Sequence, residues 1–343
     1  MTSVCGLASG FWSLFAARIG VGIGEATLSP SAYSILSDAF PKRLLGRVTA
    51  IYSIGLPLGS GIALLLGGAV ISAIGRMGRI ALPYFGVFAP WRLSFLLIGV
   101  AGIAVTAIML TVREPARRVV SIGGVGESEL GLIEFLRLRA FAIAAHFGGI
   151  SLFVLVIYGY MAWIPAFLSR TYGLSTAQIG TTYGIITALC GAAGLMIGGV
   201  SADWLFERGR MDGHLRTILI SIVVCWPLFV AMPLMPTPLA AFAVLIPMTL
   251  ASTVHGGIAG AALQLITPNH LRGRVTALYF LVANLVGLGL GPTIIAVLTD
   301  YALHDEAALR YAMVAVAAAV LPLSAIILTL GLKPFRRAIS TSV

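Results

Sequence analysis

The chain has 343 residues, of which 59% are hydrophobic and only 10% are charged, and its mean hydropathy is +1.02. Soluble globular proteins carry about 25% charged residues, so this composition excludes a soluble enzyme and a disordered chain. The apolar runs are longer than the roughly 9–11 residues of a barrel strand and do not alternate with polar residues, which excludes an outer-membrane barrel. The remaining class is a helical integral membrane protein, because helices satisfy their own backbone hydrogen bonds in hydrocarbon.

Apolar stretches that could cross a bilayer follow one another along most of the chain, since a crossing helix needs about 20 residues. Nine are predicted, at 12–38, 48–73, 93–112, 140–167, 178–204, 215–235, 239–266, 275–299 and 311–332. Residues 1–10 resemble the end of a tenth span. Ser29-Pro30 predicts a kink in the first long span.

Basic residues indicate the orientation. Sixteen Lys and Arg residues fall in one set of alternate loops and in the C-terminal tail, and five fall in the opposite loops. The positive-inside rule places the richer set in the cytoplasm. We therefore expect a multi-pass protein of a bacterial inner membrane with a cytoplasmic C-terminus. The net charge of +10 reflects this topology, and no polar module that could bind nucleic acid is predicted.

No cofactor or metal is predicted. Cys5, Cys190 and Cys225 lie in apolar segments without paired spacing, which indicates neither a disulfide framework nor a zinc site. The sequence contains no phosphate-binding glycine loop or dinucleotide fingerprint in a strand context, so transport driven by ATP is not indicated.

A repeat relates two distant parts of the chain. Residues 41–52 read PKRLLGRVTAIY and residues 268–279 read PNHLRGRVTALY, with eight of twelve positions identical. Biased composition rarely reproduces Pro, Gly-Arg and Tyr in register, so we interpret the match as a duplication within a transporter. Within the half that begins near Ala140, four spans precede the second copy, but only one span and the end of another precede the first. The sequence therefore predicts an N-terminally incomplete first half; the alternative is an unusual nine- or ten-span protein.

Two halves joined by a charged linker resemble the major facilitator superfamily of secondary transporters, and specifically its spinster-like branch. The motifs that carry this resemblance are Arg18-x6-Glu25, Asp38-Ala-Phe-Pro41, Gly46-Arg47, Trp91-Arg92-x2-Phe95, Arg113-Glu114-Pro115, Tyr158-x4-Trp163-x-Pro165 and Gly198-Gly199-x3-Asp203.

The resemblance implies an all-α membrane fold of two pseudo-symmetric halves. We expect residues 1–112 to form an incomplete N-terminal half, 113–139 a cytoplasmic linker, 140–333 a six-span C-terminal half and 334–343 a cytoplasmic tail. The expected partners are a small-molecule substrate, protons and the lipid bilayer, and the full-length protein should work as a monomer.

Arg18 and Glu25 are the only charges well inside the span 12–38. Seven residues turn a helix by about 700°, which puts both side chains on nearly one face, about 10 Å apart along the axis. Intramembrane charges are costly and therefore point to function. The resemblance implies that this pair couples protons to transport together with an acid on a first span, which this chain lacks. The alternatives are a fixed ion pair, or an outward-reaching Arg18 with a permanently protonated Glu25.

Asp203 is predicted to belong to a gate. A carboxylate at a cytoplasmic helix end can accept hydrogen bonds from the start of another helix, and the natural target is the helix that begins near Gly46 and Arg47. Four residues separate Asp203 from Arg208, which is more than in the family's loop motif, and Arg274 is the repeat equivalent of Arg47. We assign Asp203, Arg208, Arg47 and Arg274 to this gate; the alternative is a solvated charged loop.

Four polar or aromatic residues within spans are candidates for a substrate cavity: Tyr158, Trp163, His255 and Asn284. Tyr158 and Trp163 could instead be interfacial anchors. His255, like His146, could relay protons or simply be hydrogen-bonded to a neighbouring helix.

The predicted function is secondary active transport of a small organic or amphiphilic, lipid-like substrate by alternating access, coupled to protons. One alternative is a non-transporting remnant of such a protein. A membrane-embedded lipid enzyme is disfavoured, because the five His residues at 146, 214, 255, 270 and 304 form no catalytic cluster; we expect no enzyme activity.

Overall fold

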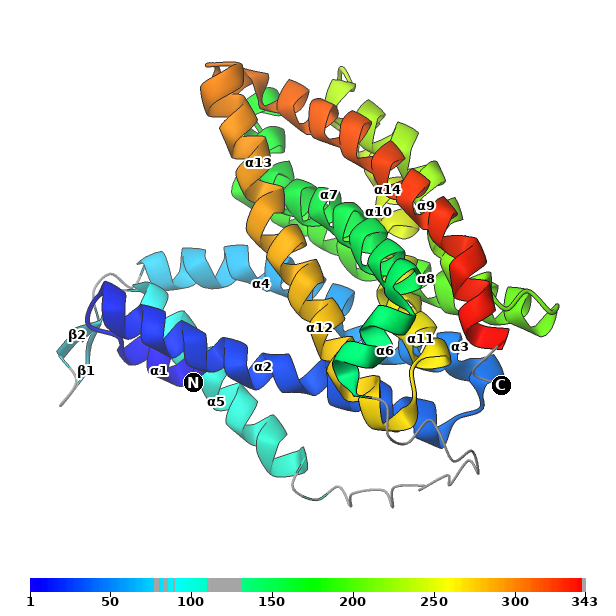
Figure 1. Cartoon of the computed structure of the whole chain (residues 1–343). Coiled ribbons are helices and arrows are strands. Elements are labelled where there is room, and N and C mark those ends of the chain that lie inside the picture. The colour runs from blue at the N-terminus through cyan, green and yellow to red at the C-terminus, as the bar shows by residue number, and fades with distance from the viewer. Residues whose placement is uncertain (77–79, 83–85, 89, 110, 112–130, 341–343) are drawn as a thin grey trace.

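Helices make up nearly all of the part of the chain that the computed structural model describes, which is residues 1–76, 80–82, 86–88, 90–109, 111 and 131–340 (Figure 1). The N-terminal elements are α1 (Thr2–Leu7), α2 (Phe11–Ala39), the 3₁₀ turn η1 (Lys42–Leu44), α3 (Leu45–Ser53), α4 (Gly55–Arg76), the strands β1 (Ile80–Leu82) and β2 (Gly86–Phe88), and α5 (Pro90–Met109). The two strands pair antiparallel, with Ala81 opposite Val87. This hairpin is the one departure from the predicted all-α fold among the described residues.

The C-terminal elements follow residues 112–130. They are α6 (Leu132–Leu138), α7 (Ala140–Tyr172), α8 (Thr176–Glu207), α9 (Gly213–Ala231), η2 (Met232–Leu234), α10 (Pro238–Thr253), α11 (His255–Ile266), η3 (Asn269–Leu271), α12 (Arg272–Asn284), the π-helix η4 (Leu285–Leu290), α13 (Gly291–Val297), the π-helix η5 (Leu298–Ala302), η6 (Glu306–Ala308) and α14 (Leu309–Ser340). Two of these elements extend beyond what the sequence indicated. The predicted linker contains helix α6, and α14 continues to Ser340, into the predicted tail.

Seven helical segments within the described residues are long and apolar enough to cross a membrane. They are Lys42–Leu65, Ala140–Tyr172, Thr176–Glu207, Gly213–Leu234, Pro238–Ile266, Asn269–Ala302 and Glu306–Ser340. The other two predicted spans, 12–38 and 93–112, correspond to α2 and α5, which fall outside this set. Helix α2 is 29 residues long, but Arg18 and Glu25 lower its mean hydropathy.

The two copies of the repeat have the same local structure. In each copy a proline ends the preceding connection and a three-residue 3₁₀ turn leads into an α-helix. The backbone angles agree closely: φ −66° and ψ 147° at Pro41 against φ −57° and ψ 146° at Pro268, and φ −109° and ψ 2° at Leu44 against φ −102° and ψ −12° at Leu271. The same residues therefore encode the same turn in both places, as a duplication requires.

Local sequence determines the tight turn between α7 and α8. Helix α7 ends at Gly173, whose φ of 67° is a left-handed conformation that glycine adopts without strain. Helix α8 then begins with a capping box, in which the Ser175 N–H donates to Gln178 Oε1 at 2.9 Å and the Gln178 N–H donates to Ser175 Oγ at 3.3 Å. The short connection, from Tyr172 to Thr176, makes α7 and α8 consecutive helices joined by a tight turn.

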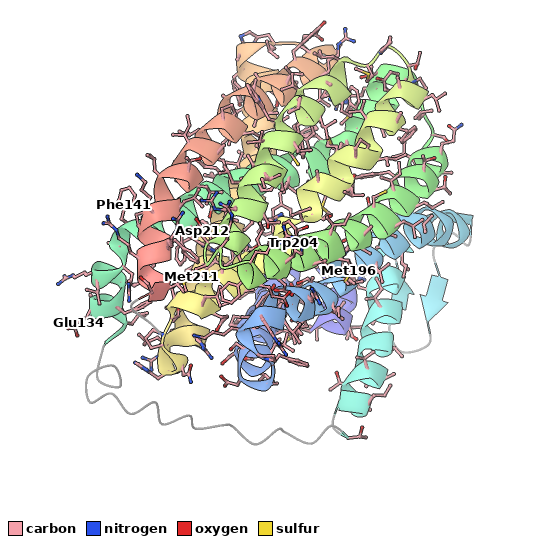
Figure 2. All side chains as sticks on the ribbon, turned by 90° about the vertical axis from the view of Figure 1, so that its right-hand side faces the viewer. Glu134, Phe141, Met196, Trp204, Met211 and Asp212 are labelled. Carbon is pink, nitrogen blue, oxygen red and sulfur yellow. The ribbon has the colours of Figure 1, made fainter. Side chains whose placement is uncertain are left out.

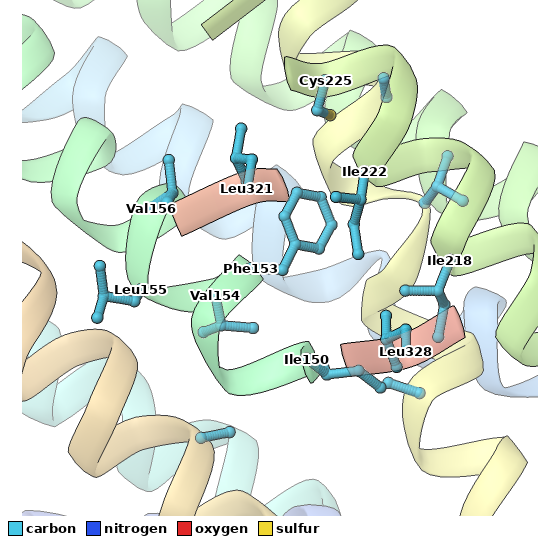
Figure 3. Close-up of a cluster of buried hydrophobic side chains, with 14 of the residues drawn as sticks. Ile150, Phe153, Val154, Leu155, Val156, Ile218, Ile222, Cys225, Leu321 and Leu328 are labelled. Atoms are coloured by element: carbon cyan, nitrogen blue, oxygen red, sulfur yellow. The ribbon is translucent and has the colours of Figure 1, made fainter. Parts of the chain in front are cut away.

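The C-terminal half contains the main apolar core. Phe153 of α7 lies beside Ile222 of α9 and Leu321 of α14 (Figure 3), and all three side chains are fully buried. Small residues let neighbouring helices approach closely around this core. Gly194 of α8 is one example, because a Cβ atom there would overlap the Leu250 carbonyl and the Thr253 hydroxyl of α10.

The two predicted halves meet chiefly along four helix pairs. Helix α8 packs against α3 and α4, α11 packs against α3, and α12 packs against α2. Because α11 and α12 are the repeat equivalents of the second part of α2 and of α3, the last two contacts are related by the duplication. In Figure 1, α2, α3 and α5 lie in the lower part of the molecule, and α7, α9, α10 and α14 lie mostly above them.

A buried carboxylate ties the end of α14 to the connection between α8 and α9. Asp212 is almost fully buried, and it accepts hydrogen bonds from Arg216 Nε and Arg336 Nη2, each at 2.9 Å (Figure 2). Burial alone would raise the pKa of Asp212, but the two arginines outweigh that effect and hold its pKa below the usual value. Asp212 therefore stays ionised in the folded protein and anchors the C-terminal helix.

We expect Gly194→Ala to destabilise the protein by about 1–3 kcal/mol, because the added methyl group overfills the contact between α8 and α10. Gly148→Ala in α7 is the matched control, since its Cβ would meet only Ile327 Cγ2, at 3.9 Å. Thermal unfolding of the purified chain in detergent measures the effect. Equal melting temperatures for the two variants would contradict the close packing at Gly194.

The Asp212 interaction predicts a specific acid sensitivity. A carboxylate with a lowered pKa adds stability above its unfolded pKa of about 3.9, and this stability is lost as the pH falls through the folded value. Asp212→Asn should therefore be less stable than the parent at neutral pH, and the difference should begin to shrink as the pH falls below about 4. Unfolding measured between pH 7 and pH 3 tests this, and a constant difference across that range would refute it.

Candidate functional site

Asp203, near the end of α8, contacts the start of α3 across the boundary between the two predicted halves. Its Oδ1 accepts a hydrogen bond from the Gly46 N–H at 2.8 Å, and its Oδ2 accepts one from the Arg47 N–H at 2.9 Å. The Arg47 Nε lies 3.5 Å from the same carboxylate, which is fully buried. The hydrogen bonds expected from the sequence at this position are present, and they neutralise the positive end of a helix from the other half.

Glycine makes this contact possible. A Cβ on Gly46 would lie 2.6 Å from Asp203 Oδ1, and a Cβ on Gly199 would lie 2.6 Å from the Gly46 carbonyl oxygen. Any larger residue at either position would push α8 away from α3. The Gly198-Gly199-x3-Asp203 motif therefore places a carboxylate and a smooth helix surface side by side.

The other two arginines assigned to the gate do not join Asp203. The Arg208 guanidinium lies 3.8 Å from the ring centroid of Trp204, one helical turn earlier on α8, and Arg208 is solvent-exposed. Trp204 and Asp212 lie at the same end of α8 (Figure 2). Arg274 is also exposed, near the start of α12. The assignment of Arg208 and Arg274 to the gate stays a prediction; in the structure the Trp204 indole gives the Arg208 guanidinium a cation–π contact.

Arg18 and Glu25 both lie on α2, and both are exposed in the described structure. The Arg18 guanidinium sits 4.9 Å from the ring centroid of Phe95 on α5. Among the described residues no ion pair joins Arg18 to Glu25. The fixed ion pair considered as an alternative is therefore not formed, and the Glu25 carboxyl group is open to its surroundings.

Two of the cavity candidates lie where α7 meets the broken helix that follows α12. Trp163 Nε1 donates a hydrogen bond to the Pro292 carbonyl at 2.9 Å. Tyr158 is half-buried and packs near Gly287 in the π-helix η4, where an added Cβ would lie 3.0 Å from its ring. Trp163 thus holds α13 against α7, and Tyr158 fills the space beside the irregular backbone that precedes Pro292.

The two intramembrane histidines are engaged with neighbouring backbone. His255 Nδ1 lies 2.6 Å from the Ser252 carbonyl, at the break between α10 and α11, and its ring meets that of Phe153 edge-on. His146 Nε2 lies 2.9 Å from the Ala259 carbonyl of α11. Asn284, the last residue of α12, is exposed. Among the described residues, no hydrogen bond joins the side chains of Asn284, His255 and Trp163 to one another.

A second contact between the halves was not anticipated. Arg272 Nη1, at the start of α12, donates to Asp38 Oδ1 at 2.9 Å and to Ser37 Oγ at 3.2 Å, both at the end of α2. The side chains are 12% and 33% exposed for Arg272 and Asp38. The signal in the sequence was a difference between the repeat copies, since Arg272 corresponds to Leu45.

Aromatic rings from α2, α3 and α12 meet around Tyr33, one turn before Ser37 on α2. Tyr33 of α2 is fully buried, and its hydroxyl donates to the Gly256 carbonyl at 3.1 Å and lies 3.2 Å from Ser53 Oγ. Its ring meets those of Tyr52 on α3 and Phe280 on α12, with centroids 5.8 and 6.0 Å apart. Tyr33 therefore joins α2, α3, α11 and α12 at a single point.

Comparison with known proteins gives three informative matches. The chain is 28% identical to an MFS-type efflux pump of Mycolicibacterium smegmatis, over 98% of this chain and 75% of the pump. It is 26% identical to protein spinster homolog 3 of Danio rerio, over 85% of this chain and 59% of that protein. A crystal structure of a bacterial homologue of the human lysosomal transporter spinster, inward-facing and unoccupied, matches with a TM-score of 0.61 at 23% identity, over 99% of this chain and 80% of that chain.

The chain spans 59–80% of the length of these relatives. Its family follows from a separate match, which covers most of this chain. The model of the Major Facilitator Superfamily matches residues 1–292. That match takes in both copies of the repeat and the Asp203 contact between them. The chain belongs to the Major Facilitator Superfamily of membrane transporters.

Proposed function

We propose that this protein is a proton-coupled secondary transporter that moves a small organic or amphiphilic, lipid-like substrate by alternating access. The observation that carries the proposal is the buried carboxylate of Asp203 bound to the start of α3 in the other half. A contact of this kind holds one side of the molecule closed with a few directional hydrogen bonds. It can be broken and remade as a unit when the halves rock, as alternating access requires.

Proton coupling is assigned to Glu25, with Arg18 as its modulating charge. The support is a carboxyl group and a guanidinium spaced two helical turns apart on a helix, α2, that packs against α12 of the opposite half. Protonation of Glu25 changes the charge on α2 by one unit. In a medium of low dielectric constant, that change is large enough to favour one arrangement of the halves over another.

Substrate binding is assigned to the space between the halves, with Tyr158 and Trp163 on its C-terminal wall. The support is the place of both residues on α7, beside the π-helix η4, where the backbone departs from regular α-helix. Irregular backbone within a membrane is tolerated where it is covered by protein or lines a cavity. A relative described as an efflux pump supports the transport of a small molecule.

We expect Glu25→Gln to abolish proton-driven accumulation and to preserve substrate exchange, because the amide cannot take up a proton but keeps the shape of the side chain. The full-length protein is reconstituted in liposomes, and uptake of a radiolabelled lysophospholipid is measured with an imposed pH gradient and in counterflow without one. Asp300→Asn, an exposed acid in η5, is the control. Proton-driven uptake by Glu25→Gln equal to the parent would remove Glu25 from the mechanism.

If Asp203 holds the gate closed, substitutions that remove more of its hydrogen bonds should open the gate further. Asp203→Ala leaves two backbone N–H groups without their acceptor, and each lost bond costs about 1–3 kcal/mol; Asp203→Asn keeps one acceptor and should have a smaller effect. The readout is the rate at which an impermeant maleimide labels Ser53→Cys from the cytoplasmic side, in a background without Cys5, Cys190 and Cys225. Asp212→Asn, on the same side but within one half, is the control. Unchanged labelling of Asp203→Ala would overturn the gate.

A further inference from the structure

The Asp38–Arg272 contact between the halves is replaced by apolar residues at the equivalent positions of the repeat. Residues 227 positions apart correspond, so Arg272 of the second copy matches Leu45 of the first, and Asp38 of α2 matches Leu265 of α11. Leu45 and Leu265 are both buried in the main apolar cluster. One side of the pseudo-symmetric interface therefore carries an ion pair where the other side carries two leucines.

The two sides are also held by different forces. On the side of α3 and α11, backbones nearly touch, since a Cβ on Gly257 would lie 2.6 Å from the Ala50 Cα. On the side of α2 and α12, the link is the charge-assisted hydrogen bond between Arg272 and Asp38, reinforced by Ser37. Close packing is insensitive to ionic strength, whereas a partly exposed ion pair is weakened by salt.

We propose that Asp38 and Arg272 form an electrostatic latch that holds the α2–α12 side of the inner gate closed. The latch acts beside the Asp203 contact and rests on the proposed function, in which the halves rock apart on this side. Tyr33 extends the contact inward, because its hydroxyl bonds to the Gly256 carbonyl and its ring meets Phe280 of α12. The interface therefore opens on its ionic side when the Asp38–Arg272 pair is lost, while glycine packing still holds the α3–α11 side.

The geometry explains why a single charge matters here. Arg272 is 12% exposed, and its Nε lies 3.4 Å from the Thr267 carbonyl, so its guanidinium has little freedom to turn toward water when Asp38 is removed. A partly buried charge that loses its partner is destabilised much more than an exposed one. Separation of α12 from α2 relieves this by exposing Arg272 to solvent.

The test measures the distance between the two turns that lead into α3 and α12. Spin labels are attached at Lys42 and Asn269, which are exposed and occupy equivalent positions in the two repeat copies. Their distance distribution is recorded by double electron–electron resonance in the full chain in nanodiscs, in a background without native cysteines. Asp38→Asn and Arg272→Gln should each shift the closed-to-open ratio about tenfold toward the longer distance, and Arg336→Gln, whose ion pair lies within one half, should leave it unchanged.

Two double variants separate a latch from a general loss of structure. Exchange of the charges, Asp38→Arg with Arg272→Asp, should restore the short distance. Asp38→Leu with Arg272→Leu reproduces the apolar pair of the other side, so its distance should be short and independent of salt. The parent should open as salt rises from 0.1 to 1 M, because the screening length falls from about 10 to 3 Å over that range.

The outcomes are distinct. If Asp203→Ala lengthens the distance and Asp38→Asn and Arg272→Gln do not, the latch is wrong and the Asp203 gate stands. If the double Leu variant opens with salt as much as the parent, the ion pair is not the salt-sensitive element and the latch is also wrong. If neither Asp203→Ala nor the latch variants change the distance, both the gate and the latch are overturned, whatever the transport assay gives.

Discussion

A carboxylate that is taken out of water must be supplied with hydrogen-bond donors, and this requirement organises the interface between the two halves. Asp203 has no exposed surface, so its charge is stable only where backbone N–H groups point at it. The start of α3 offers two such groups at Gly46 and Arg47. The close approach of α8 and α3, the glycines that permit it and the position of α3 relative to the C-terminal half all follow from this one contact.

Two other acidic residues are also held by hydrogen-bond donors, but they differ from Asp203 in burial and in where the donors lie. Asp212 is buried within one half and is held by Arg216 and Arg336, so it stabilises a fixed arrangement. Asp38 is partly exposed and is held by Arg272 across the boundary, so its interaction can be lost without unfolding either half. Asp212 is therefore an anchor within one half, whereas Asp203 and Asp38 each join the two predicted halves.

Much of this arrangement could be predicted from the sequence, because helical membrane proteins obey strong composition rules. Hydropathy predicted the positions of the long helices, and the repeat predicted that the turns after Pro41 and Pro268 share one backbone conformation. The target of Asp203 was predictable because a glycine-rich helix end and a carboxylate at fixed spacing have few ways to be satisfied. The hairpin of β1 and β2, the helix α6 and the breaks at η4 and η5 depend on packing between distant segments, which hydropathy does not report.

Individual partners were harder to predict than positions. Arg208 was assigned to the gate from its place after Asp203, and the contact of its guanidinium with the ring of Trp204, one turn earlier, was not predicted. His255 was a candidate for the cavity, yet its ring bonds to a carbonyl at a helix break that the sequence does not indicate. The Asp38–Arg272 pair was missed because the repeat was read for its identities, and the contact sits at a position where the copies differ.

The anchoring of α14 by Asp212 has a practical consequence for protein engineering. Arg336 supplies one of the two donors to a carboxylate that water cannot reach, and it lies only a few residues before the end of the helix at Ser340. Shortening the chain to remove an apparently dispensable basic tail would delete that donor and leave a buried negative charge half-satisfied. Affinity tags are therefore better appended beyond the helix than substituted for its final turn.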